Sequence, residues 1–209
     1  MATKSDVAWT IISAALTLAE TRGWQSLSLA EIAAESGQAI GRIAGEFPTK
    51  DSILIAFNRR IDAKTLEEPV DSDGSVRDRL FELIMRRLDA MAPHRTAIRA
   101  ILRDSVGDPL AALSGLCAVH RSMSLTLEAA GVSATGALGR LRAKALGALY
   151  LSTLYIWLRS DDAGNERIMA ELDKSLARAE RLATSFGRHA RPGPVRAPDS
   201  KEADSETTR

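Results

Sequence analysis

The stretch from Ser28 to Phe47 constrains the fold of this chain more than any other part of its sequence. Ser28 can cap a helix, and Glu31, three residues later, completes a capping box. The apolar residues that follow recur at helical spacing, and Gly37 can take the positive φ that ends a helix. A second helix is expected over residues 39–46. Two short helices joined by a tight turn form a helix-turn-helix, which presents its second helix to the major groove of DNA.

Helical patterns continue on both sides of this motif. Apolar spacing predicts a helix over 7–22 and another over 51–64, capped by Thr49. The remaining patterns are longer and predict helices over 76–91, 96–106, 110–130, 136–159 and 166–186. No segment has the alternation of a strand, and the abundance of Ala, Leu and Arg suits helices. The sequence therefore predicts an all-α protein.

Composition changes divide the chain into three parts. A polar stretch with Gly and Pro over 67–75 separates the short helices of residues 1–64 from the longer helices of residues 65–187. The helix at 136–159 is apolar on nearly every side between Ala145 and Leu158, so we expect it at the centre of a core. Residues 188–209 offer no core side chains, and we expect this tail to be disordered.

Charge and cysteine content exclude several classes of protein. The net charge is +1, and the first 64 residues carry equal numbers of basic and acidic side chains, so no general attraction to nucleic acid is expected. The single cysteine, Cys117, allows no disulfide framework and is expected to be inert packing in a reducing cytoplasm. The first residues lack the pattern of a secretory signal, and no uncharged apolar run is long enough to span a bilayer.

Residues 11–57 resemble the N-terminal domain of the TetR family of bacterial regulators. The resemblance rests on a series of matching positions: Ala14-Ala15, Leu18, Ala19-Glu20, Arg22-Gly23-Trp24, Leu27-Ser28, Ile32-Ala33, Ser36-Gly37, Gly41, Phe47-Pro48, Lys50 and Ile53-Leu54. It implies a TetR-like fold, with a DNA-binding domain at 1–64 and a helical ligand-binding and dimerisation domain at 65–187. It also implies a homodimer formed by the helices at 136–159 and 166–186, and a repressor controlled by a small apolar ligand.

The resemblance and the motif together give a set of candidate residues for binding double-stranded operator DNA. These are Ser28, Gln38, Ala39, Ile40, Arg42, Ile43, Glu46 and Lys50. Arg42 is the obvious donor to a guanine edge or a phosphate, and Lys50 is expected to meet a phosphate together with the amides of its helix. The family usually offers Ser, Lys, Thr and an aromatic residue from its second helix. Here Ala39, Ile40 and Ala44 stand beside Arg42, which predicts a weak generic DNA binder.

The second half of the chain has a resemblance of its own. Residues 92–95, 121–123 and 150–158 look like those of a lipid-binding auxiliary protein of ubiquinone biosynthesis, which has the TetR fold but no DNA role. The alternative function is therefore a lipid-handling accessory protein. It shares the fold and the pocket of the first hypothesis and differs in its partner, a lipid in place of DNA.

Candidates for the ligand pocket lie on the apolar stripes of the longer helices. They are Phe81, Met85, His94, Leu102, His120, Met123, Leu127 and Trp157. Methionine adapts to varied apolar ligands. His94 is otherwise expected to be a polar cap between helices, and His120 a core histidine with one hydrogen bond. Arg86 and Arg87 are expected on a solvated face.

The sequence offers no sign of catalysis or of a bound cofactor. The histidines lie far apart with no ligand at metal-binding spacing, so no metal is expected. No nucleophile, base and orienting group recur at a recognisable spacing, and there is no phosphate loop. We therefore expect a binding protein and not an enzyme.

Overall fold

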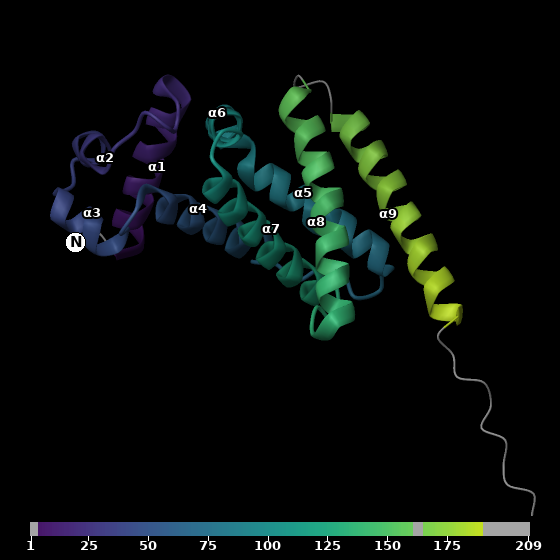
Figure 1. The fold of residues 1–209 in the computed structure, drawn as a ribbon. Helices are drawn as coiled ribbons and strands as arrows, with labels where there is room; N and C mark the ends of the chain where they lie inside the picture. Colours follow the sequence, from purple (N-terminus) through teal and green to yellow (C-terminus); the bar gives the residue numbers. More distant parts are fainter. Residues whose placement is uncertain (1–3, 161–164, 190–209) are drawn as a thin grey trace, which may run out of the picture.

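The computed structural model describes residues 4–160 and 165–189, and every regular element within them is a helix (Figure 1). The α-helices are α1 Lys4–Arg22, α2 Leu29–Ser36, α3 Ile40–Glu46, α4 Lys50–Thr65, α5 Val76–Met91, α6 Arg95–Ser105, α7 Pro109–Ala129, α8 Gly136–Arg159 and α9 Asn165–His189. A 3₁₀ turn, Ala92–His94, joins α5 to α6. The predicted all-α fold is confirmed.

Local sequence signals explain the boundaries of the first helices. The Ser28 hydroxyl accepts from the Glu31 amide, and the Glu31 carboxylate accepts from the Ser28 amide, so the predicted capping box is present. Gly37 takes a φ of 64°, which lets the amide of Gln38 return to the Ala33 carbonyl and close α2. Thr49 caps α4 in the same reciprocal way. Each of these signals lies within a few residues of the boundary that it sets.

The helices form two groups joined by α4. Helices α1, α2 and α3 pack together at one end of the molecule, whereas α8 and α9 lie at the other (Figure 1). Helix α4 contacts α1 in the first group and α5 and α7 in the second. Helix α6 also packs against α1. Helices α4 and α6 therefore both contact α1, the helix that precedes the helix-turn-helix.

Arg87 overturns the expectation of a solvated face on α5. It is only 2% exposed, and its guanidinium donates to the carboxylate of Asp62, the amide oxygen of Asn58 and the hydroxyl of Tyr150. Position 87 lies one helical turn after the buried Leu83, which puts it on the inner face of the helix. Burial lowers the pKa of Arg87, but its ionic and hydrogen-bonded partners outweigh that effect and raise it. The prediction that Arg87 is solvated was wrong because it relied on the charge of the residue and ignored its position on the inner face of α5.

Two other expectations fail because half of a helix lies outside the core. Cys117 is exposed on α7, so it is not the packed residue that was predicted. Helix α8 is not buried all round, because Leu141 is 62% exposed and Tyr155 is 58% exposed. The core side of α8 is filled by residues such as Leu146 and Tyr150, as predicted.

Two predictions reach outside the described residues. The turn expected after Ser160 falls largely on residues 161–164, and the disordered tail falls largely on residues 190–209, so both lie outside the described part of the chain. Residues 188 and 189 belong to α9, which runs past the predicted end of the last helix.

Helix α7 is the one helix of the described residues that is long and apolar enough to cross a membrane by length and composition alone. Helices in the cores of soluble proteins meet the same criterion. Here α7 packs against α4, α5, α6 and α8. We therefore treat α7 as an element of the fold.

Candidate DNA-binding surface and ligand pocket

Helix α3 is oriented by one buried side chain. Ile43 is fully buried, so this predicted DNA-binding residue belongs to the core and cannot contact a groove. At 100° per residue, Gly41 and Gly45 fall on the opposite side of the helix. A Cβ atom built on either glycine meets nothing within 4 Å, which places both in open space. The outermost face of α3 is therefore bare backbone.

Side chains flank this glycine face on both sides. Ile40 is 52% exposed and, with the exposed Ala44, forms an apolar flank. Arg42 is exposed on the other flank, and its guanidinium has no partner among the described residues. Ala39 and Glu46 are exposed as well, whereas Gln38 is half-buried. The surface offers one arginine, apolar groups and a close approach to the helix backbone.

Two of the predicted DNA-binding residues, Ser28 and Lys50, make hydrogen bonds within the protein. The Ser28 hydroxyl donates to the Glu31 carboxylate at 2.9 Å, in addition to its capping role. The Lys50 ammonium donates to the carbonyls of Trp24, Gln25 and Leu27 at 3.0, 3.0 and 3.2 Å. Lys50 thus holds the turn between α1 and α2 and does not point outward as predicted.

The same turn is also held by α6. The Asp104 carboxylate accepts from the Trp24 amide at 2.7 Å, and Gln25 donates its side-chain amide to the Asp104 carbonyl at 2.6 Å. Burial raises the pKa of Asp104, but hydrogen bonds from Arg103 and from the Gln25 and Trp24 amides outweigh this and lower it. Gly23, at φ 81°, leaves room for this carboxylate, because an added Cβ would lie 2.8 Å from it. The turn that leads into the helix-turn-helix is therefore tied to both α4 and α6.

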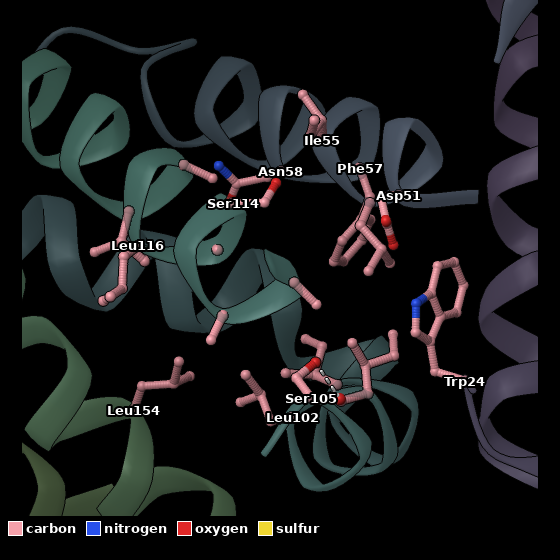
Figure 2. Close-up of a pocket in the computed structure, with 18 of the residues that line it drawn as sticks. Trp24, Asp51, Ile55, Phe57, Asn58, Leu102, Ser105, Ser114, Leu116 and Leu154 are labelled. Carbon is pink, nitrogen blue, oxygen red and sulfur yellow. Dashed lines mark hydrogen bonds between the residues drawn. The ribbon is translucent and has the colours of Figure 1, made fainter. Parts of the chain in front are cut away.

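A cavity of about 440 Å³ lies beside this turn (Figure 2). Side chains from α4, α5, α6, α7 and α8 line it, and Trp24 closes one end. Most of these side chains are apolar, including Leu54, Ile98 and Leu154. The volume and lining are those of a site for a small hydrophobic molecule.

Leu102 is the one predicted pocket residue that lines this cavity. Met123 and Leu127 are buried in the core, Trp157 is buried beneath Arg95, and Phe81 and Met85 pack against the core. These five side chains therefore lie in or against the core, whereas Leu102 is 41% exposed and lines the cavity.

The two histidines also differ from expectation. The His94 ring lies edge-on to Trp9 and Phe57, with centroids 5.6 and 5.4 Å apart, and caps no helix. Burial lowers the pKa of His94, and the charge of Lys64 lowers it further. The Nδ1 atom of His120 is buried without a hydrogen-bond partner among the described residues, so the predicted bond is not found at that atom. Neither histidine lines the cavity.

A usable signal for the pocket was present in the first half of α7. Small residues cluster there, at positions 111, 112, 114, 115 and 118, and all of them line the cavity. Small side chains on a helix that faces the interior leave space that larger ones would fill. The sequence analysis looked for large adaptable residues and so missed it.

Comparison with known proteins gives concordant results. The sequence model described as bacterial regulatory proteins, tetR family, matches residues 11–57. A TetR transcriptional regulator from Nitrosomonas europaea is 25% identical, with a TM-score of 0.69 over 84% of this chain and 98% of its own. No curated protein matches the chain by sequence.

More distant structures share the fold. A TetR transcriptional regulator from Rhodococcus sp. is 17% identical, with a TM-score of 0.60 over 84% of this chain and 96% of its own. A tetR-family transcriptional regulator from Streptomyces coelicolor is 20% identical, with a TM-score of 0.59 over 87% of this chain and 86% of its own. The alternative of a lipid-handling accessory protein is not favoured by these matches. Residues 11–57 of the chain thus match the TetR family model, and its overall fold is that of solved TetR-family transcriptional regulators.

Proposed function

We propose that the chain is a homodimeric repressor that binds operator DNA through α3 and is released from it by a small apolar ligand. Residues 1–64 form the DNA-binding domain of this proposal, and residues 65–187 bind the ligand and the second subunit. The observation that carries it is the orientation of α3, which buries Ile43 and exposes Arg42, for which the described residues supply no partner. Such a protein acts in the cytoplasm, where the operator is.

The chemistry of α3 suggests how the operator is read. An arginine donates two hydrogen bonds to a guanine in the major groove, and aliphatic side chains contact the thymine methyl group. Arg42 and the Ile40–Ala44 flank supply both. The two recognition helices of a dimer would reach successive major grooves, roughly 34–36 Å apart.

The outer face of α8 supports the dimer. Leu138, Leu141, Ala145, Ala148, Ser152 and Tyr155 alternate at spacings of three and four residues, so they share one face. Leu138, Leu141 and Tyr155 are 58%, 62% and 58% exposed in the single chain. An uncovered apolar stripe of this kind marks an interaction surface. A second copy, packed through α8 and α9, would cover it and explain why α8 is apolar on both sides.

The cavity supports ligand control. Leu102, Ser105 and Val106 of α6 line it, and Asp104 of the same helix holds the turn before α2. A molecule that fits better when α6 has shifted would move that turn and change the separation of the two DNA-binding domains. The ligand must bind the two states with different affinity, since otherwise it shifts nothing.

The DNA proposal is tested with fluorescence anisotropy on duplexes that tile the protein's own upstream region. Wild-type protein should bind one duplex specifically. Arg42→Ala should weaken that binding by about 1–3 kcal/mol, or roughly five- to 150-fold. Arg59→Ala, which removes an equal charge from the exposed side of α4, is the matched control and should bind as wild type does. Equal affinities for all duplexes, or equal losses in both variants, would argue against specific reading by α3.

The dimer is tested by sedimentation. Leu141→Glu should convert the protein to monomers at micromolar concentration, because it puts a charge in the centre of the apolar stripe. Leu110→Glu changes an even more exposed leucine, 79% exposed on α7, and should leave the dimer intact. A dimer that survives Leu141→Glu would exclude the α8 face as its interface.

A further inference from the structure

We propose that the pocket selects a neutral hydrophobic molecule whose polar group both accepts and donates a hydrogen bond, as an alcohol does, and that the group binds between Trp24 and Asp51. The inference rests on the proposed ligand control and specifies its chemistry. It makes the DNA-binding domain part of the ligand site, because both residues lie within the first 64.

Trp24 supplies the donor. The residue is only 3% exposed, and no hydrogen bond from its indole nitrogen is found among the described residues, yet this nitrogen is not one of their buried atoms that lack a partner, so it remains accessible. Figure 2 shows this nitrogen on the side of the ring that faces the pocket. A ligand that fills the pocket would cut this N–H off from water, which costs free energy unless the ligand itself offers an acceptor. A ligand with an acceptor at this position would avoid that cost.

Asp51 supplies the acceptor and sets the charge. Of the residues that line the pocket, it is the one with an ionisable carboxylate, and no basic side chain lines the cavity. It lies in the first turn of α4, where the helix dipole favours a negative charge. Figure 2 shows the Asp51 carboxylate on the same side of the pocket as the Trp24 ring. A carboxylate ligand would be repelled here, and an alkylammonium would leave the indole N–H without an acceptor.

The other polar groups of the pocket do not compete for this role. Asn58 and Tyr150 are bound to Arg87, and the Ser105 hydroxyl donates to the Ile101 carbonyl at 2.8 Å. Ser114 carries a hydroxyl that can donate or accept, so it does not discriminate between ligand charges. Selectivity for the polar group therefore falls to Trp24 and Asp51.

The test is calorimetric titration of the full-length protein with four probes of equal length. These are 1-decanol, its isomer methyl nonyl ether, decanoate and decylamine. We expect 1-decanol to bind most tightly, and the ether about five- to tenfold more weakly, because it cannot donate to Asp51. Decanoate should bind most weakly. Tighter binding of decanoate or decylamine, equal binding of the alcohol and its ether, or no binding of any probe would overturn the inference.

Variants of Trp24 and Asp51 test whether these two residues cause the selectivity for the alcohol. Trp24→Phe removes the N–H and keeps an aromatic ring, so it should lower the affinity for 1-decanol about five- to tenfold. Trp157→Phe is the matched control, since that tryptophan is equally buried but does not line the pocket, and it should leave the affinity unchanged. Asp51→Asn should raise the affinity for decanoate at least tenfold. The same changes in both tryptophan variants, or no gain for decanoate, would refute the assignment.

Measuring operator binding with the same probes separates this inference from the proposed function. If 1-decanol binds selectively but operator affinity does not change, the ligand class stands and ligand control fails. If the protein binds its operator but discriminates among none of the probes, the repressor stands and the ligand class fails.

Discussion

Alanine in place of Gly41 and Gly45 of α3 should stabilise the protein and lower its affinity for the operator. Glycine costs a helix about 1 kcal/mol relative to alanine. A Cβ at Gly41 or Gly45 meets nothing within 4 Å, so no clash offsets the gain. Each substitution should raise the free energy of unfolding by about 0.5–1 kcal/mol. In a protein of this size that corresponds to a rise in Tm of about 1–4 °C.

The effect on DNA has the opposite sign. Both methyl groups would project from the face of α3 opposite the buried Ile43, where the helix would meet the base edges. The helix would have to withdraw, and Arg42 would lose its reach to a guanine. We expect the double variant to bind the operator about tenfold more weakly, equivalent to about 1.4 kcal/mol. The stabilised protein would thus be the poorer regulator.

The assay pairs thermal unfolding without DNA with anisotropy on the operator duplex. Gly115→Ala is the control, because it also adds a methyl group to a helix in open space but lies on α7. It should raise Tm similarly and leave operator affinity unchanged. If the α3 variants gain stability and bind the operator as wild type does, the glycine face does not lie against the groove. If they gain no stability, the helix-propensity argument is wrong.

Three further predictions concern the buried Arg87 network, the turn before α2 and the His94 ring. Arg87→Met should lower the free energy of unfolding by about 3–5 kcal/mol in urea titrations, because it leaves the buried Asp62 carboxylate unpaired; a loss below about 1 kcal/mol would contradict this. Asp104→Ala should destabilise by about 1–3 kcal/mol and speed hydrogen exchange at the amides of the turn before α2, while exchange in α9 stays unchanged. His94 has a lowered pKa in the folded state, so its contribution to stability is complete above the ordinary histidine pKa and is lost as the pH falls through the folded value. His94→Gln should therefore flatten the fall in urea midpoint between about pH 7 and pH 5, and an unchanged slope would assign that fall to other groups.

The helix-turn-helix could be predicted from sequence because its signals are local. The capping pair Ser28–Glu31 and the turn glycine Gly37 act within a few residues of the boundaries that they set. The same holds for α5 and α8, whose predicted limits match the structure. Family resemblance then supplied the fold, which no local signal specifies.

The pocket and the buried network could not be predicted in the same way, because they depend on distant contacts. Arg87 meets Asp62 and Asn58 across 25 and 29 residues of chain. Lys50 appeared free for a phosphate until the structure placed three carbonyls around its ammonium. The charge of Arg87 and Lys50 gave no indication of which groups each would contact.

The sparse charge of α3 has a consequence for how such a protein would search a chromosome. Affinity for any DNA sequence grows with the number of phosphates neutralised, and its salt dependence has a slope of about −0.9 for each. With Lys50 turned inward and Arg42 alone on the exposed part of α3, few phosphates are neutralised there. The protein would spend little time on unrelated DNA, and occupancy of its operator would vary little with the ionic strength of the cell.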